Sequence, residues 1–232
     1  MKNDLQKMNI LGDVESITET TYNIFSDEEE TKFERDEDPS LIAVLTIDNT
    51  GNILEQKITL PQSHDSMSTS YVYENELKTK EISIDANGRE EHTTLEYDEN
   101  LLLVSETTKR NGNDMARTTY LYNEQSQLTE IATLYTNGVH VRRMLTYDTN
   151  GNKVEERMIE KSEFTSEERT SYTYNEHGEV TETTDYDTEG NILITTQYQY
   201  ADYDEHGNWT SKTELMDDVP IRTIIRSLQY RN

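Results

Sequence analysis

The residues best suited to binding a metal ion are the aspartates of a turn pattern, Asp-x-x-Gly, that recurs along the chain. The clearest copy is Asp148-Thr-Asn-Gly151, and others begin at Asp48, Asp85, Asp187 and Asp204. Carboxylate oxygens in a sharp loop are what Ca²⁺ prefers, but each turn lacks the distal bidentate glutamate of a twelve-residue calcium loop. Turn chemistry accounts for the same residues, because aspartate hydrogen-bonds nearby backbone and glycine takes a positive φ. We therefore predict structural turns and no metal site.

The histidines offer a second set of candidate metal ligands. They are spread at long intervals, at His64, His92, His140, His177 and His206. His177 and His206 hold the same place in two copies of the turn, so hairpins stacked in register could bring them together. A surface position in a turn is the favoured interpretation, and we predict no histidine-bound metal.

Catalytic patterns are missing from the sequence. It contains no Gly-x-Ser-x-Gly elbow, no phosphate-binding glycine loop and no His-Glu-x-x-His. The absence of cysteine removes disulfides, thiolate catalysis and Cys-ligated zinc. A glycosidase pair cannot be singled out among 47 acidic residues. The sequence therefore predicts no enzyme and no cofactor, and a glycan-active enzyme is the least favoured alternative.

Large residues recur in pairs that flank one variable position. The copies are Leu45-Thr-Ile47, Tyr71-Val-Tyr73, Leu95-Glu-Tyr97, Tyr120-Leu-Tyr122, Leu145-Thr-Tyr147, Tyr172-Thr-Tyr174, Tyr198-Gln-Tyr200 and Leu228-Gln-Tyr230. Successive second members are 24 to 30 residues apart, a period that indicates a repeat architecture. Because strand side chains alternate between faces, the two members of each pair share one face.

The tyrosine pairs have two interpretations. They either pack across neighbouring strands or form an aromatic platform for a sugar or peptide. Packing is favoured, because the pairs follow the repeat through every copy. The candidate binding surface consists of Tyr73, Tyr97, Tyr122, Tyr147, Tyr174, Tyr200 and Trp209.

Each period has room for two strands and two turns, so neighbouring strands should pair antiparallel. We expect an all-β antiparallel meander of tandem β-hairpins with roughly fifteen or sixteen strands. Twist accumulates over so many strands, which favours a curled or spiral single sheet. The repeat pattern does not determine whether this sheet closes on itself. Exposed sheet edges could pair two copies into an oligomer.

The chain divides into an N-terminal segment, residues 1–40, and a continuous repeat domain, residues 41–232. Within the first part, Lys2–Gly12 could form one or two helical turns, with Asn3 or Asp4 as the N-cap. Val14–Phe25 alternates in polarity and should be the first strand. The charged run Ser26–Pro39 is expected to be a solvated loop or hairpin tip.

Several turn phrases resemble the YD repeats of the RHS (rearrangement hot spot) family. They are Tyr97-Asp98, Tyr147–Asn152, Tyr186–Asn191 and Tyr203–Thr210. The last one is similar to the closing repeat of short bacterial YD-repeat proteins, which are often predicted lipoproteins or secreted proteins of Bacteroides-like bacteria. The resemblance implies a β-hairpin array at the cell envelope or outside the cell. The toxin-enclosing shell of large RHS proteins is not carried over, because the chain is too short for it and shows neither the protease-like core segment nor a toxin domain.

Charge narrows the range of partners. Acidic residues outnumber basic ones by 47 to 21 and no basic run occurs, which argues against nucleic acid. No apolar stretch is long enough to span a membrane. Met1–Leu11 lacks the apolar region of a signal peptide, and a leader or lipid anchor outside the given chain is left open.

We therefore expect a non-enzymatic structural or binding module at a bacterial cell envelope or in a secreted protein, with an unknown protein or glycan as its ligand. The alternative is an acidic, immunity-like partner that masks a basic protein, since the formal net charge is −26.

Overall fold

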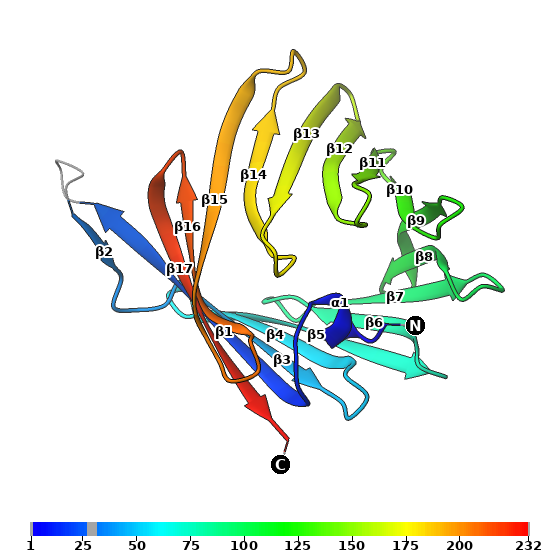
Figure 1. Cartoon of the computed structure of the whole chain (residues 1–232). Coiled ribbons are helices and arrows are strands. Elements are labelled where there is room, and N and C mark those ends of the chain that lie inside the picture. The colour runs from blue at the N-terminus through cyan, green and yellow to red at the C-terminus, as the bar shows by residue number, and fades with distance from the viewer. Residues whose placement is uncertain (1, 27–31, 232) are drawn as a thin grey trace. The chain divides into compact units, whose positions relative to one another are not determined.

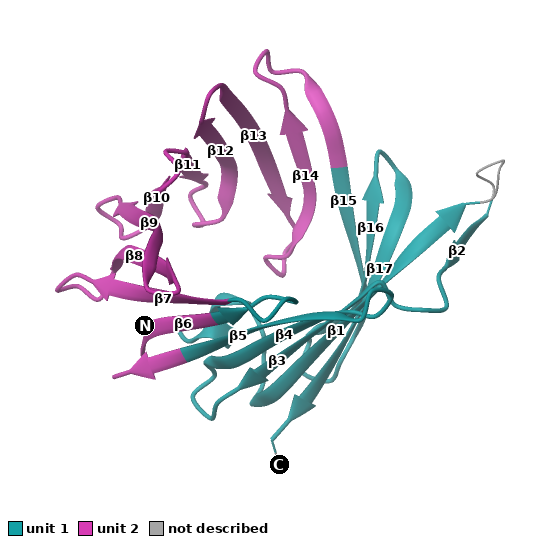
Figure 2. Cartoon of the chain, turned by 180° about the vertical axis from the view of Figure 1, so that it is seen from behind, with its two compact units in different colours: residues 1–71, 83–89, 196–232 teal, residues 72–82, 90–195 magenta. Residues whose placement is uncertain are grey.

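The computed structural model of the chain describes residues 2–26 and 32–231. They form two compact units (Figure 2), each built from segments that are discontinuous in sequence. Unit 1 comprises residues 1–71, 83–89 and 196–232, and unit 2 comprises residues 72–82 and 90–195. The fold class is all-β and antiparallel with one short helix, as predicted.

The elements are labelled in Figure 1. Unit 1 holds α1 (Asp4–Lys7), β1 (Val14–Ser26), β2 (Phe33–Arg35), β3 (Leu41–Ile47), β4 (Ile53–Leu60), most of β5 (Asp65–Glu74), β16 (Trp209–Met216) and β17 (Val219–Tyr230). Unit 2 holds β7 (Glu90–Tyr97), β8 (Leu103–Arg110), β9 (Asn113–Tyr122), β10 (Leu128–Tyr135), β11 (His140–Tyr147), β12 (Lys153–Lys161), β13 (Thr165–Tyr174) and β14 (Val180–Tyr186). Three strands contribute residues to both units: β5, β6 (Leu77–Ile84) and β15 (Ile192–Tyr203).

Strand pairing within unit 2 follows the predicted meander. Each strand from β7 to β14 pairs antiparallel with the next one along the chain. The register shifts by one residue at four of the tyrosine-bearing strand ends, as at Tyr147 opposite Lys153. Such bulges leave one extra residue on one strand and increase the local twist.

The pairing of the first strand, in unit 1, corrects the prediction of a curled or spiral single sheet with exposed edges. An open meander would leave the first and last strands of the chain as edges. Instead, β1 pairs antiparallel with β3 on one side and with β17 on the other. In register, Ile17 lies opposite both Leu45 and Leu228. Backbone groups that an open sheet would expose are therefore paired between the two ends of the chain.

The N-terminal segment supplies most of the buried apolar core in unit 1. Leu5, Ile10, Val14, Ile17 and Ile47 form this core, with Leu45, Ile53, Leu228 and Tyr230 packed against it. The predicted helical segment is confirmed as α1. Its N-cap is Asn3, whose side chain accepts from the backbone N–H of Gln6, while the Gln6 side chain accepts from the Asn3 N–H. This reciprocal pair is a capping box.

The segment is also hydrogen-bonded to two distant turns. The Leu5 N–H donates to the Gly51 carbonyl at 3.0 Å. Asn208, buried in the last turn of the repeat, accepts from the Leu11 N–H at 2.8 Å and donates to the Leu11 carbonyl at 2.9 Å. Residues close to the N-terminus thereby join the first and last repeat turns of unit 1.

The charged run Ser26–Pro39 is a hairpin in part. Strand β2 lies inside it and pairs antiparallel with the end of β1, with Phe25 opposite Glu34. The prediction for residues 27–31 lies outside the described residues. Among the residues that the structure describes, no helix is long and apolar enough to cross a membrane.

The acidic turns have one repeated geometry. In the copy at Asp148, the carboxylate Oδ1 accepts from the N–H groups of Asn150 and Asn152, at 2.8 and 2.9 Å. The Gly151 N–H donates to the Asp148 carbonyl, and Gly151 has φ +88°. The same two side-chain bonds recur at Asp48, Asp85, Asp98, Asn123, Asn175, Asp187 and Asp204. The turn itself thus uses the oxygens that a cation would need.

These hydrogen bonds predict how the turns respond to acid. The Asn152 N–H and its neighbours lower the pKa of Asp148, and the Asn191 side chain and backbone lower that of Asp187. A folded-state pKa below the ordinary value stabilises the folded state above pH 4, and this contribution is lost as the pH falls through the lowered pKa. We expect Asp148→Asn to weaken the acid-induced loss of stability below pH 4, measured by urea unfolding at several pH values. A neutral amide fits the site, as Asn175 does. An unchanged pH profile would contradict this.

Copies of the turn without glycine are strained. Leu101 holds the glycine position after Asp98 with φ +63°, a conformation that costs a side chain about 1–2 kcal/mol. Its side chain is 52% exposed, so little packing is lost on its removal. We expect Leu101→Gly to raise the free energy of unfolding by about 0.5–1 kcal/mol, measured by urea unfolding. The opposite change at an equivalent position, Gly151→Leu, should lower the free energy of unfolding. A Cβ there meets only Gln127 Nε2, at an ordinary 3.8 Å, so the cost comes from backbone strain at the positive φ and not from a clash. A less stable Leu101→Gly variant would refute this.

Candidate functional site

In unit 2, the tyrosines that are the second members of four large-residue pairs each donate a hydrogen bond from the hydroxyl to a backbone carbonyl. The hydroxyls of Tyr97, Tyr122 and Tyr147 each donate to the backbone carbonyl 19 residues earlier, at 2.7–2.9 Å, and Tyr174 donates to the Lys153 carbonyl at 2.8 Å. All four rings are half-buried. Burial raises the pKa of Tyr122, Tyr147 and Tyr174, so these hydroxyls stay protonated donors. The candidate binding surface thus uses these hydroxyls to tie neighbouring hairpins together.

The remaining members of the candidate surface are more varied. Tyr73 on β5 and Tyr200 on β15 are half-buried. Trp209 is buried, with its ring centroid 5.6 Å from that of Tyr200 and 3.4 Å from the guanidinium carbon of Arg226. That cation–π contact covers the indole, so Trp209 packs inside unit 1.

The two equivalent histidines have different surroundings. His206 stacks on Tyr230 in unit 1, with ring centroids 4.0 Å apart. The Tyr230 hydroxyl donates to Asp204 and accepts from the Asn208 side chain, and its pKa is raised to about 12 by burial and by the bond to Asp204. In unit 2, His177 Nε2 lies 3.9 Å from Glu176 Oε1. Within residues 2–26 and 32–231, no group of three or more His, Asp or Glu side chains is arranged to hold a metal ion.

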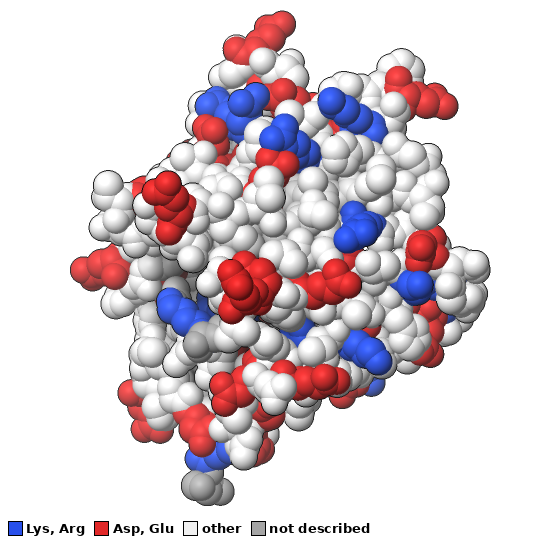
Figure 3. Space-filling view, turned by 90° about the vertical axis from the view of Figure 1, so that its right-hand side faces the viewer, with Lys and Arg blue, Asp and Glu red and all other residues white. Residues whose placement is uncertain are grey.

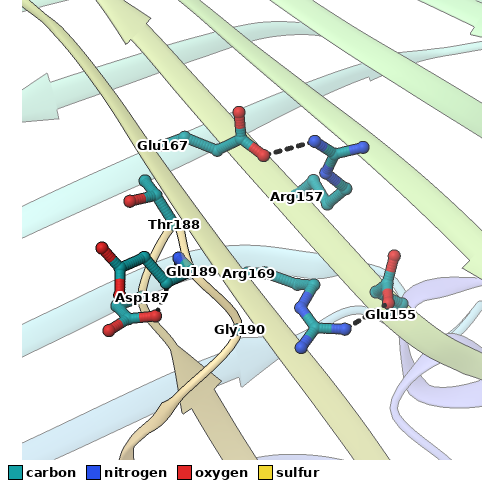
Figure 4. A pocket seen from close by; sticks show the side chains of 8 residues that line it. All are labelled: Glu155, Arg157, Glu167, Arg169, Asp187, Thr188, Glu189 and Gly190. Carbon is teal, nitrogen blue, oxygen red and sulfur yellow. Dashed lines mark hydrogen bonds and ion pairs between the residues drawn. The ribbon is translucent and has the colours of Figure 1, made fainter.

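A concave site lies on β12 and β13 in unit 2 (Figure 4). This hollow of about 410 Å³, here called the arginine hollow, is lined by Glu155, Arg157, Glu167, Arg169 and the turn residues Asp187, Thr188, Glu189 and Gly190. Arg157 and Arg169 are direct cross-strand partners, and Arg169 lies opposite Tyr186 on β14. Because side chains alternate along a strand, these residues share the face opposite to Tyr172 and Tyr174. The hollow and the tyrosine pairs therefore lie on different faces.

Crossed ion pairs hold the two arginines in place. Arg157 pairs with Glu167, and Arg169 Nη1 lies 3.5 Å from Glu155 Oε2 (Figure 4). The Arg169 guanidinium also stacks on the Tyr186 ring, 3.9 Å from its centroid. Like charges directly opposite across strands repel, so the two glutamates offset the repulsion between the arginines. The stacking fixes the plane of one guanidinium.

The carboxylates of the hollow are poorly suited to acid–base catalysis. Glu155 and Glu167 are each paired with an arginine. The Asn191 side chain lowers the pKa of Asp187, which keeps this group ionised. A general acid needs a raised pKa instead. The arrangement is suited to binding a charged ligand.

Sequence reasoning missed the arginine hollow. Its signal is the alternation of Glu155 with Arg157 and of Glu167 with Arg169, each pair on one strand face. That pattern is also common on solvated strands, and only the cross-strand register places the two arginines side by side. Acidic and basic side chains are similarly interspersed over the molecular face shown in Figure 3.

Comparison with solved structures gives a fold relationship. The chain is similar to a porin-like protein from Bacteroides uniformis ATCC 8492, with 14% identity, a TM-score of 0.59, and coverage of 94% of this chain and 99% of that one. A porin-like protein from Bacteroides vulgatus ATCC 8482 matches with 9% identity and a TM-score of 0.42, covering 95% and 99%. TcdB2-TccC3 without its hypervariable C-terminal region matches with 13% identity and a TM-score of 0.34, covering 87% of this chain and 14% of that one. No family model and no curated protein matches.

Proposed function

We propose that this chain is a non-enzymatic binding module of the bacterial cell envelope, with the arginine hollow as its ligand site. The observation that carries the location is the fold shared with the porin-like protein of Bacteroides uniformis over nearly the whole length of both chains. The turn geometry at Tyr147–Asn152 is consistent with repeats of the YD type, which we propose form one continuous sheet. The paired carboxylates of the hollow favour binding over catalysis.

We further propose that this binding module does not span the membrane. On unit 2, the hollow face carries Arg157 and Glu167, while the tyrosine face carries Lys153 and Glu156. An arginine or lysine at the bilayer midplane costs about 2–4 kcal/mol on a lipid-facing strand. Charges on both faces therefore support a location in water at the envelope surface.

Co-sedimentation with envelopes tests this function. Purified chain is mixed with isolated Bacteroides envelopes and sedimented at low and high salt, with a tyrosine-rich control protein of similar net charge alongside. We expect the chain, and not the control, to sediment with the envelopes at low salt and to a smaller extent at high salt, because screening weakens the ionic contacts of the hollow. Recovery of the chain in the supernatant at both would overturn the proposal.

A second candidate is an acidic partner for a basic protein, favoured by the net charge of −26. Electrostatic association weakens steeply with ionic strength. Capture of one basic protein from the envelope fraction, released by salt, together with no binding to the washed envelopes, would favour this candidate over the envelope module.

A further inference from the structure

Asn-Gly pairs occur four times in the chain, each in a turn between two strands. They are Asn87-Gly88, Asn111-Gly112, Asn137-Gly138 and Asn150-Gly151. Asparagine is chemically labile, because the backbone nitrogen of the following residue can attack the carbon of its side-chain amide. Glycine is the most reactive following residue, since it has no Cβ to hinder the approach. By sequence alone, the four pairs are equal candidates for spontaneous deamidation.

Hydrogen bonds in the turns protect three of these pairs. In each of the three, the glycine N–H donates to the carbonyl three residues earlier, at 2.9 Å for Gly88, 3.0 Å for Gly138 and 3.1 Å for Gly151. Attack by this nitrogen on the asparagine side chain requires that bond to break first. Asn137 is held a second time, because its side-chain oxygen accepts from the Val139 N–H at 3.1 Å.

The fourth pair, Asn111-Gly112, forms the two-residue loop between β8 and β9. Its residues have φ +51° and +77°, as the central residues of a type I′ hairpin turn do. Arg110 and Asn113 on either side are direct cross-strand partners. Within the part of the chain that the structure describes, neither the Gly112 N–H nor the Asn111 side-chain amide has a hydrogen-bond partner. Attacking atom and attacked group are thus both unoccupied.

Space around this loop is also sufficient for the reaction. Asn111 and Gly112 are both exposed, and a Cβ built on Gly112 meets no atom within 4 Å. The peptide unit that joins them can rotate toward the reactive geometry and break only a long 3.5 Å contact from Asn113 Nδ2 to the Asn111 carbonyl. Gly88 and Gly138 are equally open, so the feature that distinguishes the fourth pair is its unbonded glycine N–H.

We propose that Asn111 is a self-modification site, at which the side chain deamidates through a cyclic imide. The Gly112 nitrogen attacks Asn111 Cγ and forms a new C–N bond. The bond from Cγ to the side-chain nitrogen breaks, and this nitrogen leaves as ammonia with the proton of the Gly112 N–H. Water then opens the imide at either carbonyl, which gives aspartate or isoaspartate. Both products add a negative charge, and the only co-reactant is water.

The two products act differently on the hairpin. Aspartate tolerates a positive φ and keeps the backbone of the loop unchanged. Isoaspartate inserts one extra carbon into the backbone of a loop whose length and turn type set the register of the strands. We therefore expect isoaspartate to loosen the tip of the hairpin, where Lys109 Nζ lies 3.1 Å from Asp114 Oδ1, and to speed hydrogen exchange at Asn113 and Asp114.

Peptide mapping of the full chain by mass spectrometry, during incubation in mildly alkaline buffer, tests the site. We expect Asn111 to deamidate about tenfold faster than the other three asparagines, since one hydrogen bond of ordinary strength changes an equilibrium by up to about that factor. In urea, where the turns are lost, the four rates should become equal. Equal rates in the folded chain would overturn the proposal. The same order of rates in urea would also overturn it, because the turns would then not be the cause.

Matched variants connect the chemistry to the hairpin. Asn111→Gly removes the reactive amide and keeps a loop sequence, Gly-Gly, that type I′ turns favour. In this variant, hydrogen exchange on β8 and β9 should stay constant during the incubation, whereas in the wild-type chain it should rise as isoaspartate accumulates. The control Asn150→Gly should behave as the wild-type chain does. A rise in Asn111→Gly equal to that of the control would refute the assignment.

Discussion

Replacing Ile17 with alanine is expected to lower the free energy of unfolding of unit 1 by about 2–5 kcal/mol. Ile17 is fully buried, lies opposite Leu45 and Leu228 in register, and belongs to the core made by the N-terminal segment. Deleting its side chain removes apolar contacts and leaves a cavity between the strands at the two ends of the chain. Few other residues are so well buried, so this core has little to compensate the loss.

Trp209 provides the measurement. It is the only tryptophan, lies in unit 1 and is 9% exposed, so its fluorescence during urea unfolding reports on unit 1. The control is Ile192→Ala, in which a side chain 64% exposed is removed and the midpoint should change little. Equal midpoints for the wild-type chain and the Ile17 variant would show that β1 is not part of the stable core.

Replacing Tyr147 with alanine should destabilise unit 2 by about 2–4 kcal/mol. The ring is half-buried on β11, and its hydroxyl donates to the Leu128 carbonyl at 2.8 Å. Tyr147→Phe keeps the ring and loses only this hydrogen bond, so we expect a loss of about 1 kcal/mol. Hydrogen exchange of the β10 and β11 amides measures both effects locally, and far-UV circular dichroism follows the unfolding of the strands.

Tyr135 is the matched control, because it is a tyrosine of unit 2 with 42% of its surface exposed. Tyr135→Ala should leave exchange on β10 and β11 close to that of the wild-type chain. An unchanged unfolding midpoint for Tyr147→Ala would instead support the aromatic-platform interpretation, in which the ring is available to a ligand. The two interpretations of the tyrosine pairs therefore give opposite results for one variant.

Much of the local structure was determined by the sequence alone. Strand β1 lies close to its predicted bounds, and the four-residue α1 lies within the predicted helical segment Lys2–Gly12, with Asn3 as its N-cap, one of the two candidates. Capping and alternation depend on neighbouring residues. The Asp-x-x-Gly turns were predicted for the same reason, since the aspartate side chain bonds to backbone two and four residues ahead. The pairing of consecutive strands in unit 2 follows from the short connections between them.

Only the tertiary structure decided where β1 lies and which face holds a concave site. No pattern of neighbouring residues predicts that Ile17 pairs with Leu228, which is 211 residues away. This pairing depends on burying the apolar side chains from both ends of the chain in one core. The same is true of Asn208, which in the sequence is one more turn residue. In the structure its side-chain oxygen accepts from the Leu11 N–H and its side-chain nitrogen donates to the Leu11 carbonyl. Arg157 and Arg169 meet because one cross-strand register aligns them. Register is set by the whole hairpin and its turn, so the arginine hollow could not be predicted from either strand alone.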